Sequence, residues 1–404
     1  MFGAADGILI MIVNQDYALL IISLSAALLP GLSRRVGLPS PVAEILFGVL
    51  IGKSFLNLEI QGEWFPFLAE LGFMVLMFQA GMEIDFKLLK GQGKKSITFH
   101  TALFGLTIIS AWFCTLFLDA NTFMILVLST TSLGLVMPIL KESGIQSSNF
   151  GQTVLIAATF ADFLTLLGIT FYVLWKVNGI GLHLLTPLLL FLGFAVILWL
   201  ARLWAWWNPE KTEKLLLTET LQEQGVRVSL ALLFLFICLS EAAHLEPVLG
   251  AFMGGCILSF VMRKKDNLES KISVIGFGFL IPMFFIHVGM GFDVNNILSL
   301  DSLIFTLELF IASVLVKFLP CLIFPLWGMK LSDGLKAGAL LSSRLSLIIA
   351  AAAVGLKEGF ISEQAKDSIV LLALITCMIG PLTFRFLSTR FSRRKGIFDP
   401  ENQL

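Results

Sequence analysis

Apolar residues along the 404-residue chain gather in long runs that short polar stretches separate. A run of about 20 apolar residues is long enough to cross the hydrocarbon core of a bilayer as a helix. The pattern therefore predicts an all-α polytopic membrane protein with about thirteen transmembrane helices. The predicted spans are 17–33, 38–53, 66–84, 97–118, 121–141, 150–175, 181–206, 227–244, 246–262, 275–292, 301–327, 334–356 and 366–389.

The distribution of lysine and arginine predicts the orientation of these spans, because such residues concentrate in cytoplasmic loops. One set of alternate connections, with the C-terminal tail, carries 22 of the 28 basic residues, and the other set carries four. Lys317 and Arg344 fall inside spans. The split predicts an outside N-terminus and a cytoplasmic C-terminus. The polar connection 207–227 is expected to form a short cytoplasmic helix.

Composition agrees with a chain dissolved in lipid. Hydrophobic residues make up 57% of the chain and charged residues only 14%, against about 25% in soluble domains, which excludes a soluble enzyme. The five cysteines lie in apolar runs without metal-ligand or disulfide spacing. The N-terminal stretch MFGAADGILIMIVNQD has no basic residue, so we expect no cleaved signal peptide.

Three ionisable residues lie deep within predicted spans, where lipid disfavours charge. Asp162 lies 12 and 13 residues from the ends of its span, and Lys317 and Arg344 are similarly central in theirs. Each is a candidate for ion transport, or alternatively for an ion pair that holds helices together. Glu70 lies nearer a span end, and His287 is a candidate proton relay for which packing is the simpler interpretation.

Polar, helix-breaking residues occupy the middle of two spans. One span contains Thr130, Thr131 and Ser132 before a glycine and a proline, and the other contains Ser343 beside Arg344. Hydroxyls can bond backbone groups that an unwound helix releases, although such residues also occur in ordinary helix packing. The two spans occupy the same position in two three-helix blocks of opposite orientation. This placement predicts inverted repeats with two unwound helices that cross near the membrane midplane.

Six motifs in order resemble the monovalent cation:proton antiporter superfamily, in its branch of Nap-type Na⁺/H⁺ and Kef-type K⁺/H⁺ antiporters. The motifs are LPSPVAEILFGVLIGKS, LAELGFMVLMFQAGMEIDFKLLK, LSTTSLGLVMPILKESG, VLGAFMGGCILS, PMFFIHVGMGFD and SSRLSLIIAAAAVGLKEG. The ion-carrying acid of the family corresponds to Asp162 in AATFADFLTL, whereas Ala161 stands where many members have a second acidic or amide residue. Lys317, which resembles a lysine that pairs with that residue, is therefore expected to face Asp162, another acid or water.

The resemblance implies scaffold and dimer-forming helices around a moving core. The expected domains are scaffold at 1–96 and 227–300, core repeats at 97–175 and 301–390, a linker at 176–226 and a tail at 391–404. It also implies a homodimer in the bacterial inner membrane, in contact with lipid and without nucleic-acid partners or cofactors. Because about fifteen residues follow the last span, we expect no C-terminal nucleotide-binding domain.

These observations predict exchange of Na⁺ or K⁺ for H⁺ by alternating access. Burial favours the protonated form of a carboxyl, while a nearby ammonium favours the ionised form, so Asp162 could hold a proton or a cation in turn. Hydroxyls of Thr130, Thr131 and Ser132 would complete an oxygen shell around the cation. One carboxylate predicts electroneutral one-for-one exchange, unless Lys317 also changes protonation, and Arg344 would offset the negative helix ends or pair with an acid.

Three other functions are considered for the same residues. Ala161 is compatible with an uncoupled, channel-like or sensory protein, and Arg344 could hold the carboxylate of an organic anion in a symporter. An intramembrane enzyme is disfavoured, because the chain has no HExxH pair and one deeply buried carboxylate. The sequence alone does not distinguish Na⁺ from K⁺.

Overall fold

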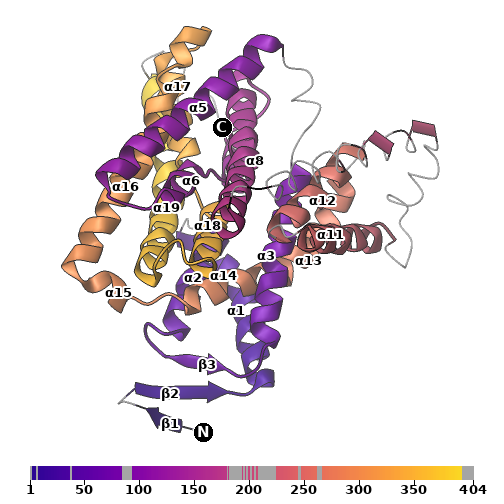
Figure 1. Cartoon of the computed structure of the whole chain (residues 1–404), viewed down its shortest axis with the longest axis vertical. Helices are drawn as coiled ribbons and strands as arrows, with labels where there is room; N and C mark the ends of the chain where they lie inside the picture. Colours follow the sequence, from indigo (N-terminus) through magenta and orange to yellow (C-terminus); the bar gives the residue numbers. More distant parts are fainter. Residues whose placement is uncertain are drawn as a thin grey trace, which may run out of the picture. The chain divides into compact units, whose positions relative to one another are not determined.

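The apolar spans form helices in the computed structural model of the chain (Figure 1). The structure describes residues 2–5, 8–36, 39–83, 93–179, 181, 224–243, 247–261 and 266–393, together with seven isolated positions between 193 and 207. The predicted span 181–206 lies outside these residues apart from residue 181 and the isolated positions, as do residues 208–223 of the polar connection and 394–404 of the tail. Residues 224–227 of the connection begin α11, and residues 391–393 of the tail end α19. The chain forms two units, residues 1–87 with 170–295 and residues 88–169 with 296–404.

Helices of the first unit pack in neighbouring pairs. Helix α3 packs against α12 and α14, α2 packs against α1 and α14, and α11 packs against α12. A five-residue π-helical turn, Gly276–Leu280, connects α13 to α14. The bounds are α1 Gln15–Val36, α2 Ser40–Ile51, α3 Trp64–Glu83, α11 Gln224–Ala242, α12 Pro247–Val261, α13 Asp266–Ile275 and α14 Ile281–Met290.

The second unit contains two interrupted helices among continuous ones. Helix α16 packs against α5, α17 and α19, and α18 packs against α19. The helices of this unit are α5 Lys94–Phe117, α6 Phe123–Ser129, α7 Leu133–Glu142, α16 Leu300–Cys321, α17 Leu331–Leu341, α18 Ser346–Lys357 and α19 Glu363–Arg393. The short helix α15, Asn295–Leu298, begins with the last residue of the first unit and continues into the second. Helix α8, Asn149–Asn178, begins in this unit and ends in the first.

Twelve of the thirteen predicted spans coincide with apolar helices or broken helix pairs in the described residues. Eight helices are long and apolar enough to cross a membrane, the bent pair α17–α18 adds a ninth, and three shorter apolar helices start at Ser40, Phe123 and Pro247. The polytopic helical architecture is therefore confirmed.

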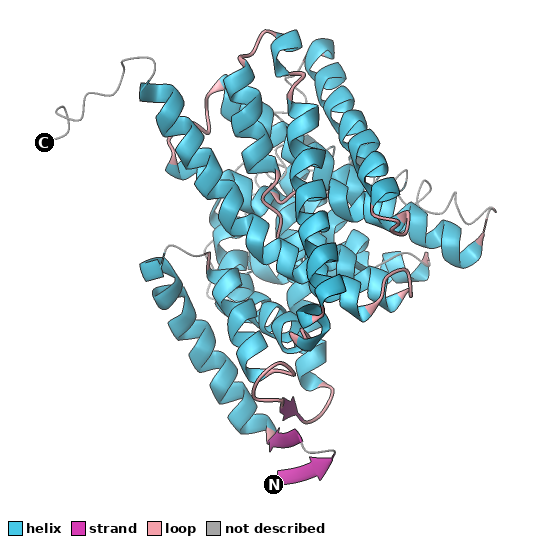
Figure 2. Cartoon of the chain, turned by 90° about the vertical axis from the view of Figure 1, so that its left-hand side faces the viewer, coloured by secondary structure: helices cyan, strands magenta, loops and turns pink. Residues whose placement is uncertain are grey.

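Three short strands beside the N-terminus were not predicted (Figure 2). Strand β1, Phe2–Ala5, pairs antiparallel with β2, Ile8–Val13, in a register that places Phe2 opposite Met11. Strand β2 pairs in parallel with β3, Leu58–Ile60. These strands precede the first span or follow α2, so they add to the helical fold without interrupting a span.

Close contact between α3 and α12 depends on glycine. A Cβ atom placed on Gly255 would overlap the backbone carbonyl of Phe78, and one on Gly81 would overlap the carbonyl of Phe252. Small residues let helix backbones approach in lipid, where van der Waals packing replaces the hydrophobic effect as the main attraction between helices. The two glycines therefore fix how closely these helices pack.

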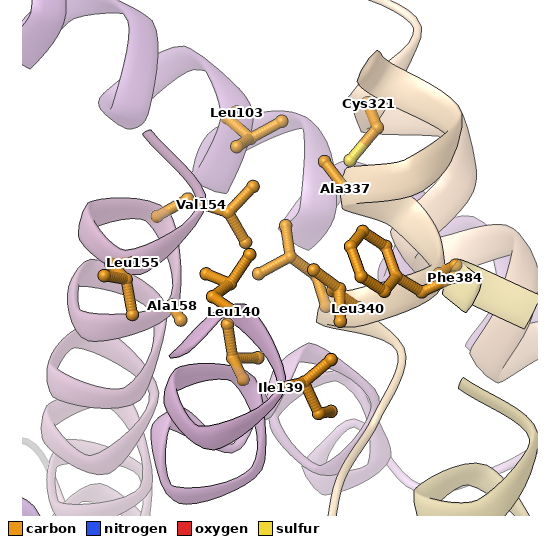
Figure 3. Packing of buried hydrophobic residues seen from close by; sticks show 14 of the residues in the cluster. Leu103, Ile139, Leu140, Val154, Leu155, Ala158, Cys321, Ala337, Leu340 and Phe384 are labelled. Carbon is orange, nitrogen blue, oxygen red and sulfur yellow. The ribbon is translucent and has the colours of Figure 1, made fainter. Parts of the chain in front are cut away.

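One apolar core in the second unit joins both interrupted helices to their neighbours (Figure 3). Leu140 of α7 and Leu340 of α17 are fully buried and belong to the same cluster as Val154 and Ala158 of α8. Phe384 of α19 packs beside them. This packing holds the two breaks in one unit, together with the part of α8 that carries Asp162.

Candidate functional site

Asp162 belongs to helix α8, and its carboxylate lies beside the N-terminus of helix α7. Its Oδ2 accepts a hydrogen bond from the backbone N–H of Leu133, the first residue of α7, at 3.0 Å. Its Oδ1 is buried and has no hydrogen-bond partner among the described residues. The N-terminus of a helix carries partial positive charge, which stabilises a carboxylate at this position. One oxygen of Asp162 is thus held by the helix, and the other is free to bind a proton or a cation.

The break between α6 and α7 consists of Thr130, Thr131 and Ser132, all buried. Thr130 Oγ1 donates to the carbonyl of Val127 at 2.7 Å, and Ser129 Oγ donates to the carbonyl of Ile125 at 2.6 Å. Such side-chain bonds compete with the helical backbone pattern. The helix therefore opens at the hydroxyl run, whereas the proline four residues after Gly134 lies within α7.

Lys317 of α16 binds the other end of this break. Its Nζ donates to the carbonyl of Ser129 at 2.7 Å and to Thr131 Oγ1 at 2.9 Å, and its side chain is buried. Ser129 is the last residue of α6, and the carbonyls at a helix C-terminus carry partial negative charge. The ammonium therefore satisfies backbone that the break releases, a hydrogen-bond partner that the sequence did not indicate, and it also interacts electrostatically with Asp162.

Arg344 lies in the second break, between α17 and α18, which are bent by 48°. Its guanidinium is fully buried and donates from Nη2 to the carbonyl of Ser313 on α16 at 2.9 Å. Its Nε and Nη1, and Oγ of the neighbouring Ser343, have no hydrogen-bond partner within the described part of the chain. Arg344 thus binds a backbone carbonyl within α16, one turn before Lys317.

The two breaks approach each other through a pair of serines. Ser132 Oγ lies 3.5 Å from Ser346 Oγ at the start of α18. Asp162 and Lys317 attract each other electrostatically, whereas the like charges of Lys317 and Arg344 repel each other. No ion pair shorter than 4.0 Å links Asp162 to either base in the ranges that the structure describes. The second unit therefore brings together Asp162, the hydroxyl run, Ser343 and both buried bases.

The remaining candidates contribute differently. Ala161 is buried beside Asp162, and its carbonyl accepts a hydrogen bond from the hydroxyl of Thr165. Glu70 on α3 and His287 on α14 belong to the first unit, and both side chains are exposed. The His287 ring packs edge-on against Phe65, with 5.4 Å between ring centroids. This contact agrees with a packing role for His287.

Sequence reasoning missed three groups at the site, the Leu133 N–H and the carbonyls of Ser129 and Ser313. All three belong to the backbone, so residue type does not reveal them. The Ser-Thr run predicted where a helix would open, but not which side chains would meet the released groups.

Comparison with known proteins gives a consistent picture. Residues 21–390 match the sequence model of the family described as sodium/hydrogen exchanger, transmembrane. YjbQ of Bacillus subtilis strain 168 is 32% identical over 395 residues, which cover 92% of this chain and 63% of YjbQ, so the chain spans less than two thirds of that relative.

GerN of Bacillus cereus, named as a Na⁺/H⁺-K⁺ antiporter, is 25% identical over 381 residues, covering 92% of this chain and 95% of GerN. The solved structure of the sodium proton antiporter MjNhaP1 from Methanocaldococcus jannaschii superimposes with a TM-score of 0.65 at 16% identity, over 93% of this chain and 98% of that protein. This likeness confirms the fold.

Proposed function

The chain belongs to the sodium/hydrogen exchanger transmembrane family, and from this premise we propose that it exchanges Na⁺ or K⁺ for H⁺ across the membrane at Asp162. Support comes from one observation above all. Asp162 Oδ2 is fixed by the N-terminus of α7, while Oδ1 is buried and unpartnered among the described residues. A free carboxylate oxygen at this depth binds either a proton or a dehydrated cation, and exclusive binding at one site couples their transport.

Oxygen atoms near Asp162 complete the proposed cation site. Ser132 Oγ lies at the approach of the two breaks, and the Thr130 and Thr131 hydroxyls keep lone pairs beyond the hydrogen bonds they make. Alkali cations prefer hard oxygen ligands of this kind. The name of GerN includes K⁺, so both Na⁺ and K⁺ are candidates for this chain.

The buried bases have separate proposed roles. Lys317 holds the end of α6 open by binding the Ser129 carbonyl, and Arg344 fixes the second break to α16. With neither base in an ion pair with Asp162 among the described residues, the exchanged charge stays on one carboxylate. We therefore propose electroneutral exchange of one cation for one proton.

The molecule acts within a membrane in this proposal. The second unit is the moving core and the first is the scaffold that forms a homodimer. The N-terminus faces outward and the C-terminus faces the cytoplasm of a bacterial cell, as the 22 bases on one side indicate.

Reconstituted exchange tests the site. Purified protein in liposomes with an internal pH dye is given Na⁺, Li⁺ or K⁺ pulses, beside Asp162→Asn. The variant should lose exchange, because an amide does not take up a transported proton and has no negative charge to bind a cation. A buried carboxyl elsewhere, Glu44 of α2, provides the matched control Glu44→Gln, which should keep exchange. Undiminished exchange in Asp162→Asn would exclude the proposed site.

A further inference from the structure

The chain passes between its two units at three points, after residues 87, 169 and 295. The first point lies outside the described residues, and the second lies inside α8. The third falls between Asn295 and Asn296, at the start of the four-residue helix α15. Hydrogen bonds from distant parts of the sequence fix the chain on both sides of this third point.

Ser54, in the turn after α2, fixes the side that belongs to the first unit. Its Oγ donates to the carbonyl of Phe292 at 2.7 Å and accepts from the N–H of Val294 at 3.1 Å. The N–H of Lys53 donates to the carbonyl of Met290 at 3.2 Å. The segment that follows α14 is therefore bound to the end of α2 as far as Val294.

Asp367 of α19 fixes the side that belongs to the second unit. Its carboxylate is fully buried, and Oδ2 accepts from Asn296 Nδ2 at 2.7 Å. Its Oδ1 lies 3.0 Å from Nζ of Lys366. One residue further along α19, Ser368 Oγ accepts from Thr306 Oγ1 of α16 at 3.0 Å. Asn296, the first residue of the second unit after the crossing, is thus bound to α19, and α16 is bound to the same turn of α19.

We propose that Asn295 is the pivot at this crossing, and that Ser54 and Asp367 are positioning residues that confine the change to the backbone between Val294 and Asn296. Asp367 anchors Asn296 through the hydrogen bond to Oδ2, while its Oδ1 lies within ion-pair distance of Lys366. The proposal rests on the proposed function to the extent that alternating access moves the units. The pivot and its two anchors would keep helices α14 and α16 intact while the backbone between them changes conformation.

Hydrogen–deuterium exchange tests the two anchors without measuring transport. Asn296→Ala, which removes one hydrogen bond, should raise deuterium uptake in residues 290–298 about fivefold, and Ser54→Ala, which removes two, should raise it at least as much. Asp367→Asn keeps an oxygen for the Asn296 amide and should rescue the uptake seen in Asp367→Ala. Ser148→Ala is the matched control for Ser54, because Ser148 Oγ also donates to a carbonyl and accepts from a backbone N–H, within unit two.

Transport kinetics of the same variants distinguish a pivot from a merely structural contact. Ser54→Ala and Asn296→Ala should lower the maximal exchange rate about threefold or more while leaving the preference between Na⁺ and K⁺ unchanged, since hinge positions act on conformational steps and lie away from the ion. Uptake that stays at the wild-type level in 290–298, or that rises instead along α14 or α16, would overturn the proposal. Failure of Asp162 as the ion site would leave this deuterium result unaffected.

Discussion

Thr131 and Thr130 are neighbours with the same side chain and the same complete burial, yet their hydroxyls serve different groups. Thr131 Oγ1 accepts from the Lys317 ammonium at 2.9 Å, whereas Thr130 Oγ1 donates to the Val127 carbonyl at 2.7 Å. A buried ammonium requires acceptors, and hydrogen bonds to charged groups stabilise more than neutral ones. The contribution of a residue at this site therefore depends on the charge of its partner.

Thr131→Val should destabilise the protein by about 1.5–3 kcal/mol, because it removes one of the two described acceptors of Lys317. Thr131→Ser, which keeps the oxygen, should restore most of the loss. Thr130→Val is the control and should cost about 1 kcal/mol or less, since only a neutral bond within one turn is lost. Thermal unfolding of purified protein in detergent measures all three, and equal losses in the two valine variants would contradict this assignment.

The partner of Lys317 shows why residue type was insufficient to predict the site. Asp162 was identified from its depth in a span, and the Ser-Thr run identified the break. Because Ala161 is apolar, the partners expected for Lys317 from the sequence were Asp162, another acid or water. The structure gives it the Ser129 carbonyl, a group that every residue has and that becomes available only where a helix ends.

Asp367 was missed because it lies near the end of its predicted span, where a charge is unremarkable.

Among the elements, α3 and α12 show how lipid-embedded helices are held at a fixed distance. Gly255→Ala should destabilise the protein by about 1–3 kcal/mol, because the added methyl group overlaps the Phe78 carbonyl and separates the helices.

Gly105 of α5 provides the control, since a Cβ atom there would meet no atom within 4 Å. Gly105→Ala should be neutral or stabilise by up to about 1 kcal/mol through helix propensity. Thermal unfolding of both variants under the same conditions compares them. Equal effects would indicate that the α3–α12 contact tolerates a larger separation.

The helical elements were predictable because length and apolarity suffice to identify a span, even where the helix breaks. The strands were not. Strand β2 reads ILIMIV, a six-residue apolar run too short for a span, and its partner β3 is only three residues long and lies more than 40 residues further on. Pairing over that separation depends on how α1 and α2 bring the two segments together, which no local pattern encodes.

At the scale of the whole molecule, the net charge of zero conceals an uneven arrangement. Most bases lie at one side of the predicted membrane, while Asp162, Lys317 and Arg344 lie together in the second unit. Lys317 binds the Ser129 carbonyl at the first break, and Arg344, in the second break, binds the Ser313 carbonyl of α16. Asp162 is the one acid of the three, and its Oδ1 has no hydrogen-bond partner in the described structure. Coupled exchange then follows from competition at that oxygen, and cation binding should weaken as pH falls because protons occupy the same site.

Proton release on cation binding tests this competition most directly. Purified protein in weakly buffered detergent solution receives Na⁺ or K⁺ while a pH electrode or dye follows the protons released, and calorimetry counts the cations bound. At a pH at which Asp162 is fully protonated before the cation is added, the wild type should release one proton for each cation bound, and Asp162→Asn should release none. Cation binding without proton release in the wild type, or undiminished release in Asp162→Asn, would contradict the assignment of Asp162 as the shared site.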